Sequence, residues 1–252
     1  YFPKFFHPDP TVDRQSGFLQ PHLNNSKILG TSLLAPYFHV ISDNKDITIK
    51  PTIFDSDIYM LSNEYRQENK SSSFIADVGI TKGYQSSSKD NNKNSIGHLF
   101  SKFDLDLGLS NFFESNLNIS LEKVTNDTYL KIFDTNLINT DKYIKPSNQN
   151  QLTSSATLTL NHENFNFDSG FTVYEKLDGL SSDRYEYVLP YYNFSSTDII
   201  ENNYGSFNFS SNGSNNLKST NNLKTVVDNN FDFETKPILS NLGLKNSFGA
   251  YF

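Results

Sequence analysis

Three features of the sequence predict an all-β fold. Hydrophobic and polar residues alternate with a period of two along most of the 252 residues, as they do in strands whose two faces meet different surroundings. The hydrophobic side chains are largely aromatic, with 22 Phe and 14 Tyr, and aromatic residues favour pleated strands. Stretches rich in Asn, Asp and Ser separate the alternating segments and favour turns. Because no helical period is found, we expect antiparallel strands joined by turns.

The alternation can be followed segment by segment. In residues 102–109, every second residue is Phe or Leu, and the residues between them are Lys, Asp or Gly. Comparable segments are 74–84, 117–122, 156–161, 165–173, 185–191, 207–209, 231–233 and 242–252. The turn-forming stretches are 42–46, 86–95, 110–115, 135–150, 202–205 and 210–216. Together these segments predict about ten to twelve strands.

The pattern alone fits either a soluble sandwich with one wet face or a transmembrane barrel. Three observations favour the barrel. The polar face carries Asn, Asp, Thr, Ser and Gly, as a water-filled lumen requires; aromatic residues gather near strand ends; and short connections alternate loosely with long ones. A membrane-spanning helix is excluded, because no run approaches the ~20 consecutive apolar residues that it needs. We therefore expect a partial transmembrane antiparallel β-barrel, with a soluble β-sandwich as the alternative.

Charge and residue types argue against several other classes of protein. The net charge of −7 and the scattered Lys and Arg residues argue against nucleic acid as a partner. The chain has no cysteine, so it has no disulfide and no thiolate metal site. Its five histidines are widely spaced, and neither a Gly-x-Ser-x-Gly elbow nor a phosphate-binding loop is present. We expect no catalytic site, no metal and no cofactor.

Four blocks within the first 134 residues carry a more specific signal. Residues 6–21 read FHPDPTVDRQSGFLQP, and the residues of interest within them are Arg14, Ser16, Gly17, Phe18 and Leu19. The other blocks are 36–41 with 44–51, which contains Asp46; 63–66, which ends at Arg66; and 123–130 with 133–134. In this order the blocks resemble the start of the barrel in the LptD family of lipopolysaccharide-assembly proteins. Asp13 departs from the family pattern, in which Lys or Arg is frequent at that place.

The resemblance covers the first half of the chain and implies how the chain is organised. Residues 1–252 are interpreted as the amino-terminal part of a larger barrel, in which residues 1–22 form the entrance and the first strands. A separate second domain is not expected. The sequence opens on Tyr1 with no signal peptide, so we expect it to be a piece of a longer protein.

The resemblance also implies a function in the bacterial outer membrane. Members of the family insert lipopolysaccharide into the outer leaflet. Their partners are the lipoprotein plug LptE, the periplasmic bridge protein LptA, reached through an amino-terminal domain outside this chain, and the barrel-assembly machinery. The alternative is a porin-like or autotransporter-type barrel that acts as a passive channel or an adhesin.

Prolines in the first block are the candidates for a lateral gate. A proline cannot donate to a β-ladder, so Pro8, Pro10 and Pro21 each weaken strand pairing where they lie. In the family, such prolines loosen the seam through which the glycolipid leaves, although Pro8 fits a domain edge equally well. Arg14 and Arg66 can pair with acidic lumen groups or with phosphate, and the pairing is preferred. Asp46 is expected to be a turn residue.

Overall fold

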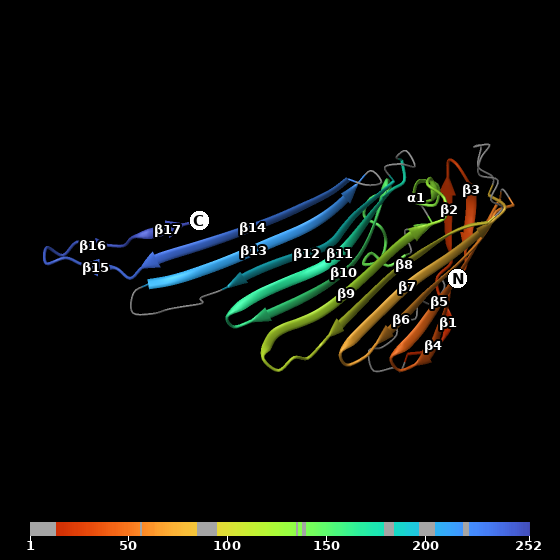
Figure 1. The fold of residues 1–252 in the computed structure, drawn as a ribbon. Coiled ribbons are helices and arrows are strands. Elements are labelled where there is room, and N and C mark those ends of the chain that lie inside the picture. The colour runs from red at the N-terminus through yellow and green to blue at the C-terminus, as the bar shows by residue number, and fades with distance from the viewer. Residues whose placement is uncertain are drawn as a thin grey trace.

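The structure is a computed structural model that describes residues 14–55, 57–84, 95–134, 136–137, 140–178, 184–196, 205–218 and 222–252. Within these residues the chain forms a 15-stranded antiparallel sheet, a separate two-stranded hairpin and one short helix (Figure 1). The all-β antiparallel prediction is confirmed. The sheet is open, with the first strand at one edge and β17 at the other.

The first nine strands are β1 (Gly17–Phe18), β2 (His22–Ser26), β3 (Gly30–Leu34), β4 (Tyr37–Ser42), β5 (Lys45–Phe54), β6 (Tyr59–Glu68), β7 (Ser72–Lys82), β8 (Ser95–Asp106) and β9 (Phe112–Val124). The helix α1 (Tyr129–Ile132) follows. The remaining strands are β10 (Gln151–His162), β11 (Phe165–Lys176), β12 (Tyr185–Ser196), β13 (Gly205–Lys218), β14 (Asn222–Thr235), β15 (Ile238–Leu239), β16 (Lys245–Asn246) and β17 (Gly249–Tyr251).

The first two strand positions of the sheet are each split into two pieces. β3 and β4 pair with the two halves of β5, so they occupy one position in the sheet. β1 pairs with β4 and β2 pairs with β3, so these two share the position at the edge. From β5 onward each strand pairs with the next one along the chain as far as β14, which pairs with β17. This splitting raises the number of strand segments above the number that alternation alone predicts.

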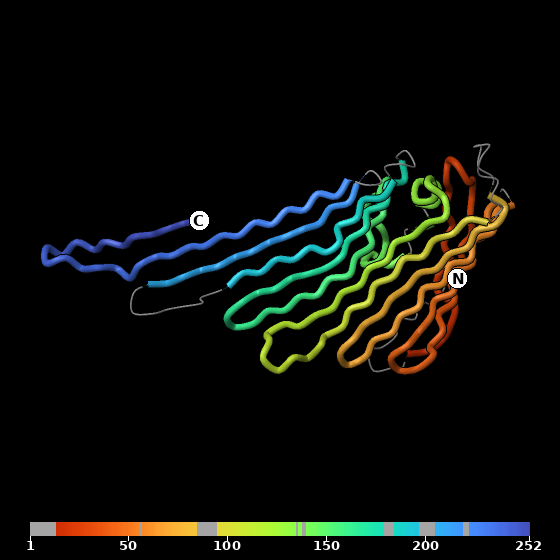
Figure 2. Tube along the Cα trace, in the orientation of Figure 1, coloured from red at the N-terminus to blue at the C-terminus, as the bar shows by residue number. Residues whose placement is uncertain are grey.

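The sheet curls at its amino-terminal end and extends at the other (Figure 2). The strands from β2 to β10 curve around α1, whereas β13 and β14 run out as a long ribbon that ends near the β15–β16 hairpin (Figure 1). β7 and β9 finish at the same end of the sheet, and long stretches of sequence separate them from β8 and β10. The opposite end carries the turns after β4, β6 and β8.

In the curled part of the sheet, many buried side chains are polar and many exposed side chains are apolar, which is the reverse of a water-soluble domain. On β5, Asp46 and Lys50 are buried on what we call the inner face, whereas Ile53 on the outer face is exposed. On the outer face, Leu61 of β6 lies directly opposite Ile80 of β7, and both side chains are exposed. A polar interior wall with an apolar exterior is the arrangement of barrels that span membranes.

The inner segment, our name for the described residues between 125 and 150 (125–134, 136–137 and 140–150), lies against the inner face. Tyr129, Phe133 and Leu137 are almost fully buried, and they pack in one cluster with Phe54 and Phe100 of the sheet. Within the described residues, no helix is long and apolar enough to cross a membrane. The prediction that residues 135–150 only form turns was incomplete, because apolar side chains along 129–144 fold this connection into a core.

The prediction of a turn at residues 210–216 was wrong. These residues lie inside β13 and pair in register with β14. Asn, Ser and Gly usually indicate turns in water-soluble proteins. Here a polar wall that faces the interior uses the same residue types within a strand, so composition alone does not separate the two cases.

Candidate functional site

The split in the first strands falls at three prolines that lie side by side. Pro21 separates β1 from β2, and Pro36 separates β3 from β4. Pro51 lies in β5, and its carbonyl accepts a hydrogen bond from Ala35 N at 3.2 Å. We call this region, residues 19–21 with 35–36 and Pro51, the proline break.

The break lowers the number of backbone hydrogen bonds that hold the edge strand. A proline has no N–H. Three neighbouring strand positions therefore each lack one backbone hydrogen-bond donor at about the same level along the strands. Leu19 N still donates to Pro36 O at 2.9 Å. On one side of the break β1 pairs with β4 at Gly17 and Phe18, and on the other side β2 pairs with β3 along residues 22–26. The middle of the edge strand is therefore weakly attached.

The residues of the first sequence block are placed around the break. Ser16 Oγ accepts a hydrogen bond from Val40 N at 2.9 Å and fixes the start of β1 against β4. Phe18 lies on the outer face, where its ring meets the edge of Tyr37 at 5.0 Å between centroids. Leu19 is exposed in the break. Pro8 and Pro10 lie outside the described residues.

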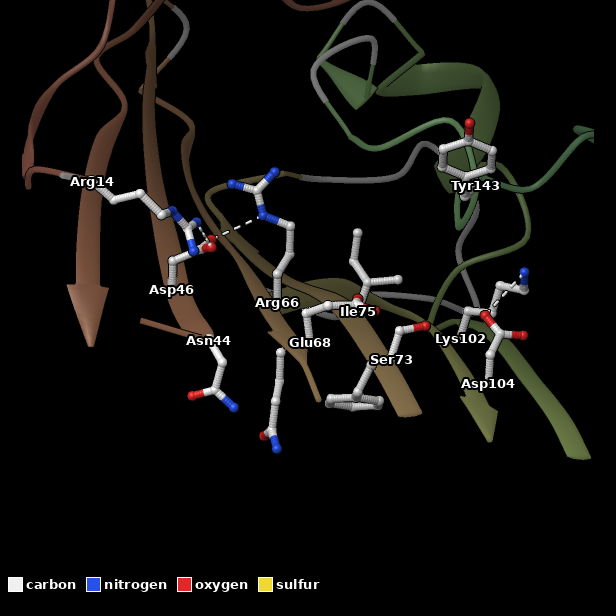
Figure 3. Close-up of a pocket in the computed structure, with 12 residues that line it drawn as sticks. Arg14, Asn44, Asp46, Arg66, Glu68, Ser73, Ile75, Lys102, Asp104 and Tyr143 are labelled. Atoms are coloured by element: carbon white, nitrogen blue, oxygen red, sulfur yellow. Dashed lines mark hydrogen bonds and ion pairs between the residues drawn. The ribbon is translucent and has the colours of Figure 1, made fainter. Parts of the chain in front are cut away.

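Arg14 and Arg66 meet on a single carboxylate (Figure 3). Arg14 Nη2 is paired with Asp46 Oδ2, and Arg66 Nε donates to Asp46 Oδ1 at 2.9 Å. The Arg14 guanidinium also lies 5.5 Å from the centre of the Phe38 ring. The expectation that the arginines pair with an acidic inner group is thus confirmed. Asp46 is the shared partner in β5 and not merely a turn residue.

A hollow of about 530 Å³ opens next to this ion cluster. Arg14, Asp46 and Arg66 form one side of it, and Lys102 with Asp104 forms the other (Figure 3). Ile75 lies between the two sides, and Tyr143 of the inner segment faces the space from opposite the sheet. Further lining residues are Asn44, Gln67, Glu68, Ser73 and Phe74. The hollow lies at the end of the sheet where the turns after β4, β6 and β8 are found.

Next to the hollow, a buried polar network ties the inner segment to the sheet. Lys50 Nζ donates to Glu64 Oε2 at 2.6 Å and to Asp77 Oδ2 at 3.2 Å. From the inner segment, Thr140 Oγ1 donates to Asp77 Oδ2 at 3.0 Å, and Asp141 N donates to Glu64 Oε2 at 3.3 Å. The network offsets the cost of burying these charges, because each carboxylate meets a cation and a further donor.

His98 connects Asp77 to Tyr129. Its Nε2 lies 3.3 Å from Asp77 Oδ1 and its Nδ1 lies 2.7 Å from the Tyr129 hydroxyl oxygen. An ionised carboxylate only accepts hydrogen bonds, so His98 Nε2 is the donor in its hydrogen bond with Asp77. Burial raises the pKa of Tyr129, so its hydroxyl stays protonated and can donate a hydrogen bond to His98.

Sequence reasoning missed two sets of these residues. Pro36 and Pro51 were not identified as parts of the break. Pro21, Pro36 and Pro51 are spaced fifteen residues apart. That regular spacing could have indicated that the three prolines lie next to one another on successive strands of similar length. The network of Lys50, Asp77 and His98 had no local signal, because its members come from different strands. Across the described part of the chain, no group of three or more His, Asp or Glu side chains could hold a metal ion.

These features define a class of protein. An antiparallel sheet with an apolar exterior, a polar inner wall and a segment folded against that wall is of the transmembrane β-barrel type. The soluble sandwich does not fit, because the described residues form one large sheet and not two sheets packed on each other.

Sequence comparison gives the particular relatives within this class. The chain is 28% identical over 178 residues to the LPS-assembly protein LptD of Legionella pneumophila strain Lens, a match that covers 66% of this chain and 20% of that protein. It is 30% identical over 132 residues to the LPS-assembly protein LptD of Polaromonas sp. strain JS666, covering 52% and 16%. The match to LptD of Cupriavidus pinatubonensis strain JMP 134 is 38% identical over 56 residues, or 22% and 7%.

These matches make the chain LptD-like in sequence. It spans about a fifth or less of the length of these curated relatives. No model of a known protein family matches the chain. These relatives are named for LPS assembly and not as enzymes.

Proposed function

We propose that this chain forms part of an outer-membrane barrel that inserts lipopolysaccharide into the outer leaflet, with the proline break as the lateral exit. The observation that carries the proposal is the loss of backbone donors at Pro21, Pro36 and Pro51 in three neighbouring strand positions. In hydrocarbon an unpaired backbone group costs several kcal/mol, so a membrane strand lacks donors only where another requirement opposes pairing. Sideways passage of a lipid-anchored substrate is such a requirement.

The inner segment supports this function over a wide passive channel. Its core residues and the buried network of Asp77 and Glu64 fix it against the inner face of β5–β8. A substrate that reaches this part of the barrel meets a filled interior on one side and the weakly paired edge on the other. The substrate therefore leaves more easily sideways, through the proline break, than along the barrel interior.

The remaining parts of the proposal follow from the LptD-like sequence. The partners would be lipopolysaccharide, the lipoprotein plug LptE, the bridge protein LptA and the barrel-assembly machinery, in the outer membrane of a Gram-negative cell. Residues 1–22 would form the entrance to the barrel, and Pro8 and Pro10 would extend the gate in the part of the chain that precedes the described residues.

Replacing Pro21 and Pro36 with Ala in the full-length protein tests the exit. Each replacement restores an N–H, which strengthens the ladder between the first strands. We expect slower export, measured in living cells as newly made surface lipopolysaccharide per folded barrel.

Pro237→Ala is the matched control, because Pro237 lies in the connection between β14 and β15, away from the break. We expect normal export from the control. Export at the unmodified rate from the Pro21→Ala, Pro36→Ala double variant would rule out the break as the exit.

A further inference from the structure

The hollow lies on the inner wall, and none of the residues of the proline break lines it. Two guanidinium groups are brought together there by one carboxylate. The side chain of Asp46 is only 4% exposed, whereas those of Arg14 and Arg66 are 45% and 42% exposed. Anything that enters the hollow therefore meets the arginines and not the carboxylate that holds them.

The charges around the hollow are equal in number but not equally placed. Lys102 and Asp104 form an ion pair at 3.2 Å with similar exposure, so that side is close to neutral. Glu68 lies at the exposed end of β6. The cluster contains two arginines and one carboxylate, with Glu64 Oε1 a further 4.0 Å from Arg66 Nη1, and it is the cationic side of the space.

Arg66 has donors to spare. Its Nε is used for Asp46, and its Nη1 lies 4.0 Å from Glu64 Oε1, too far for a hydrogen bond. Among the described residues, neither terminal nitrogen of Arg66 donates to another group. A planar guanidinium held by its Nε offers two parallel N–H groups, which is the geometry that binds a phosphate in a bidentate way.

The rest of the lining suits a ring with hydroxyl groups. Tyr143 is 70% exposed and presents an aromatic ring with a hydroxyl, and Ser73 and Asp104 add hydrogen-bonding oxygens. Ile75 supplies an apolar patch between the charged sides (Figure 3). The volume lies in the range of roughly 300–1,000 Å³ in which proteins hold small organic ligands.

We propose that this hollow is a binding subsite for a phosphorylated saccharide, with the phosphate on Arg14 and Arg66 and the sugar ring beneath Tyr143. The inference rests on the proposed function for the source of the saccharide, the polar head of the transported glycolipid. A free sugar phosphate offers the same chemistry and is separated from it by the test.

The test is calorimetric titration of the full-length protein in phospholipid nanodiscs. The probe is the soluble phosphorylated oligosaccharide obtained from deacylated lipopolysaccharide. We expect saturable binding that Arg66→Gln and Arg14→Gln each weaken about tenfold or more, because each removes charge-assisted hydrogen bonds to phosphate. Arg66→Lys keeps the positive charge but loses the paired N–H groups of the guanidinium. Its affinity for the oligosaccharide should therefore lie between that of the unmodified protein and that of Arg66→Gln. Heat-modifiable migration in gels verifies that each variant is folded.

Lys123→Gln is the matched control, because Lys123 is half exposed and pairs with Glu175 at the opposite end of β9. It should leave the affinity unchanged. Phosphatase treatment of the oligosaccharide should weaken binding, and glucosamine 6-phosphate should bind more weakly than the oligosaccharide. Equal affinity of the oligosaccharide for the unmodified protein and the Arg14→Gln, Arg66→Gln double variant would overturn the proposal, as would inorganic phosphate binding as tightly as the oligosaccharide.

The outcome is separable from that of the exit. If the oligosaccharide does not bind but the Pro21→Ala, Pro36→Ala variant still slows export, the subsite is rejected and the exit stands. If the oligosaccharide binds through the arginines and the Pro21→Ala, Pro36→Ala variant exports at the unmodified rate, the subsite is supported and the exit is rejected.

Discussion

At the scale of single residues, a tight steric constraint lies between Gly79 and His98. The two residues are paired across β7 and β8, and a β-carbon at position 79 would occupy the space of the His98 ring. His98 cannot move freely, because it is held between Asp77 and Tyr129 and stacks on Phe100. The absence of a side chain at position 79 is therefore a requirement of the buried network.

Gly79→Ala should lower the stability of the folded barrel by about 1–3 kcal/mol, the usual cost of overpacking. The measurement is the urea midpoint of unfolding in detergent or lipid. Gly17→Ala is the control, because a β-carbon at Gly17 would have no neighbour within 4 Å. We expect that variant to stay within about 0.5 kcal/mol of the unmodified protein. Similar losses for both variants would contradict the steric argument.

The ion cluster shows what can and cannot be predicted for single residues. The types of Arg14 and Arg66, in a strand pattern with a polar face, were enough to predict acidic partners. They were not enough to identify Asp46 as the shared partner, because Arg14 and Asp46 are 32 residues apart and meet only after β4 has paired between them. The network around Lys50 depends in the same way on long-range register.

At the scale of elements, the inner segment decides how the interior is filled. Phe133 is fully buried and touches the rings of Phe54, Tyr84 and Tyr129, with centroid distances between 4.8 and 6.2 Å. Phe54 belongs to β5, Tyr84 to the connection after β7 and Tyr129 to α1. Phe133 therefore holds the segment to the sheet.

Phe133→Ala should remove about 3–5 kcal/mol of packing and detach the inner segment. Limited proteolysis of the folded protein measures this, since a detached segment exposes its backbone to cleavage between residues 125 and 150. Tyr143→Ala, at an exposed position of the same segment, should be cleaved no faster than the unmodified protein. Equal cleavage rates for Phe133→Ala and the unmodified protein would show that the segment is held by other contacts.

Strands were easier to predict than connections. Alternation in residues 102–109 correctly indicated β8, although the strand ends at Asp106 and the last two leucines lie in the turn. The inner segment escaped prediction because its apolar residues have neither strand nor helix periodicity over a useful length. The break at Pro36 was not predicted because its role depends on Pro21, which interrupts the neighbouring strand position between β1 and β2.

At the scale of the whole molecule, three parts fit one route. The hollow lies at one end of the inner face, the inner segment fills the interior beside it, and the proline break lies at the edge of the sheet. Arg14 belongs to both the hollow and the start of the edge strand, since it pairs with Asp46 across β4. A glycolipid could thus be held by its head at the edge where its lipid chains leave.

The most direct test of this route is pulse-labelled photocrosslinking in living cells. A photoreactive residue is placed at Leu19, in the break, or at Ile119, on the outer face of β9, and lipopolysaccharide is labelled in a short pulse. Because bulk outer-leaflet glycolipid reaches Ile119 only after export, the label should appear on Leu19 first, and the delay should lengthen when Pro21 and Pro36 are replaced with Ala. Simultaneous labelling of both positions, or earlier labelling of Ile119, would contradict the account.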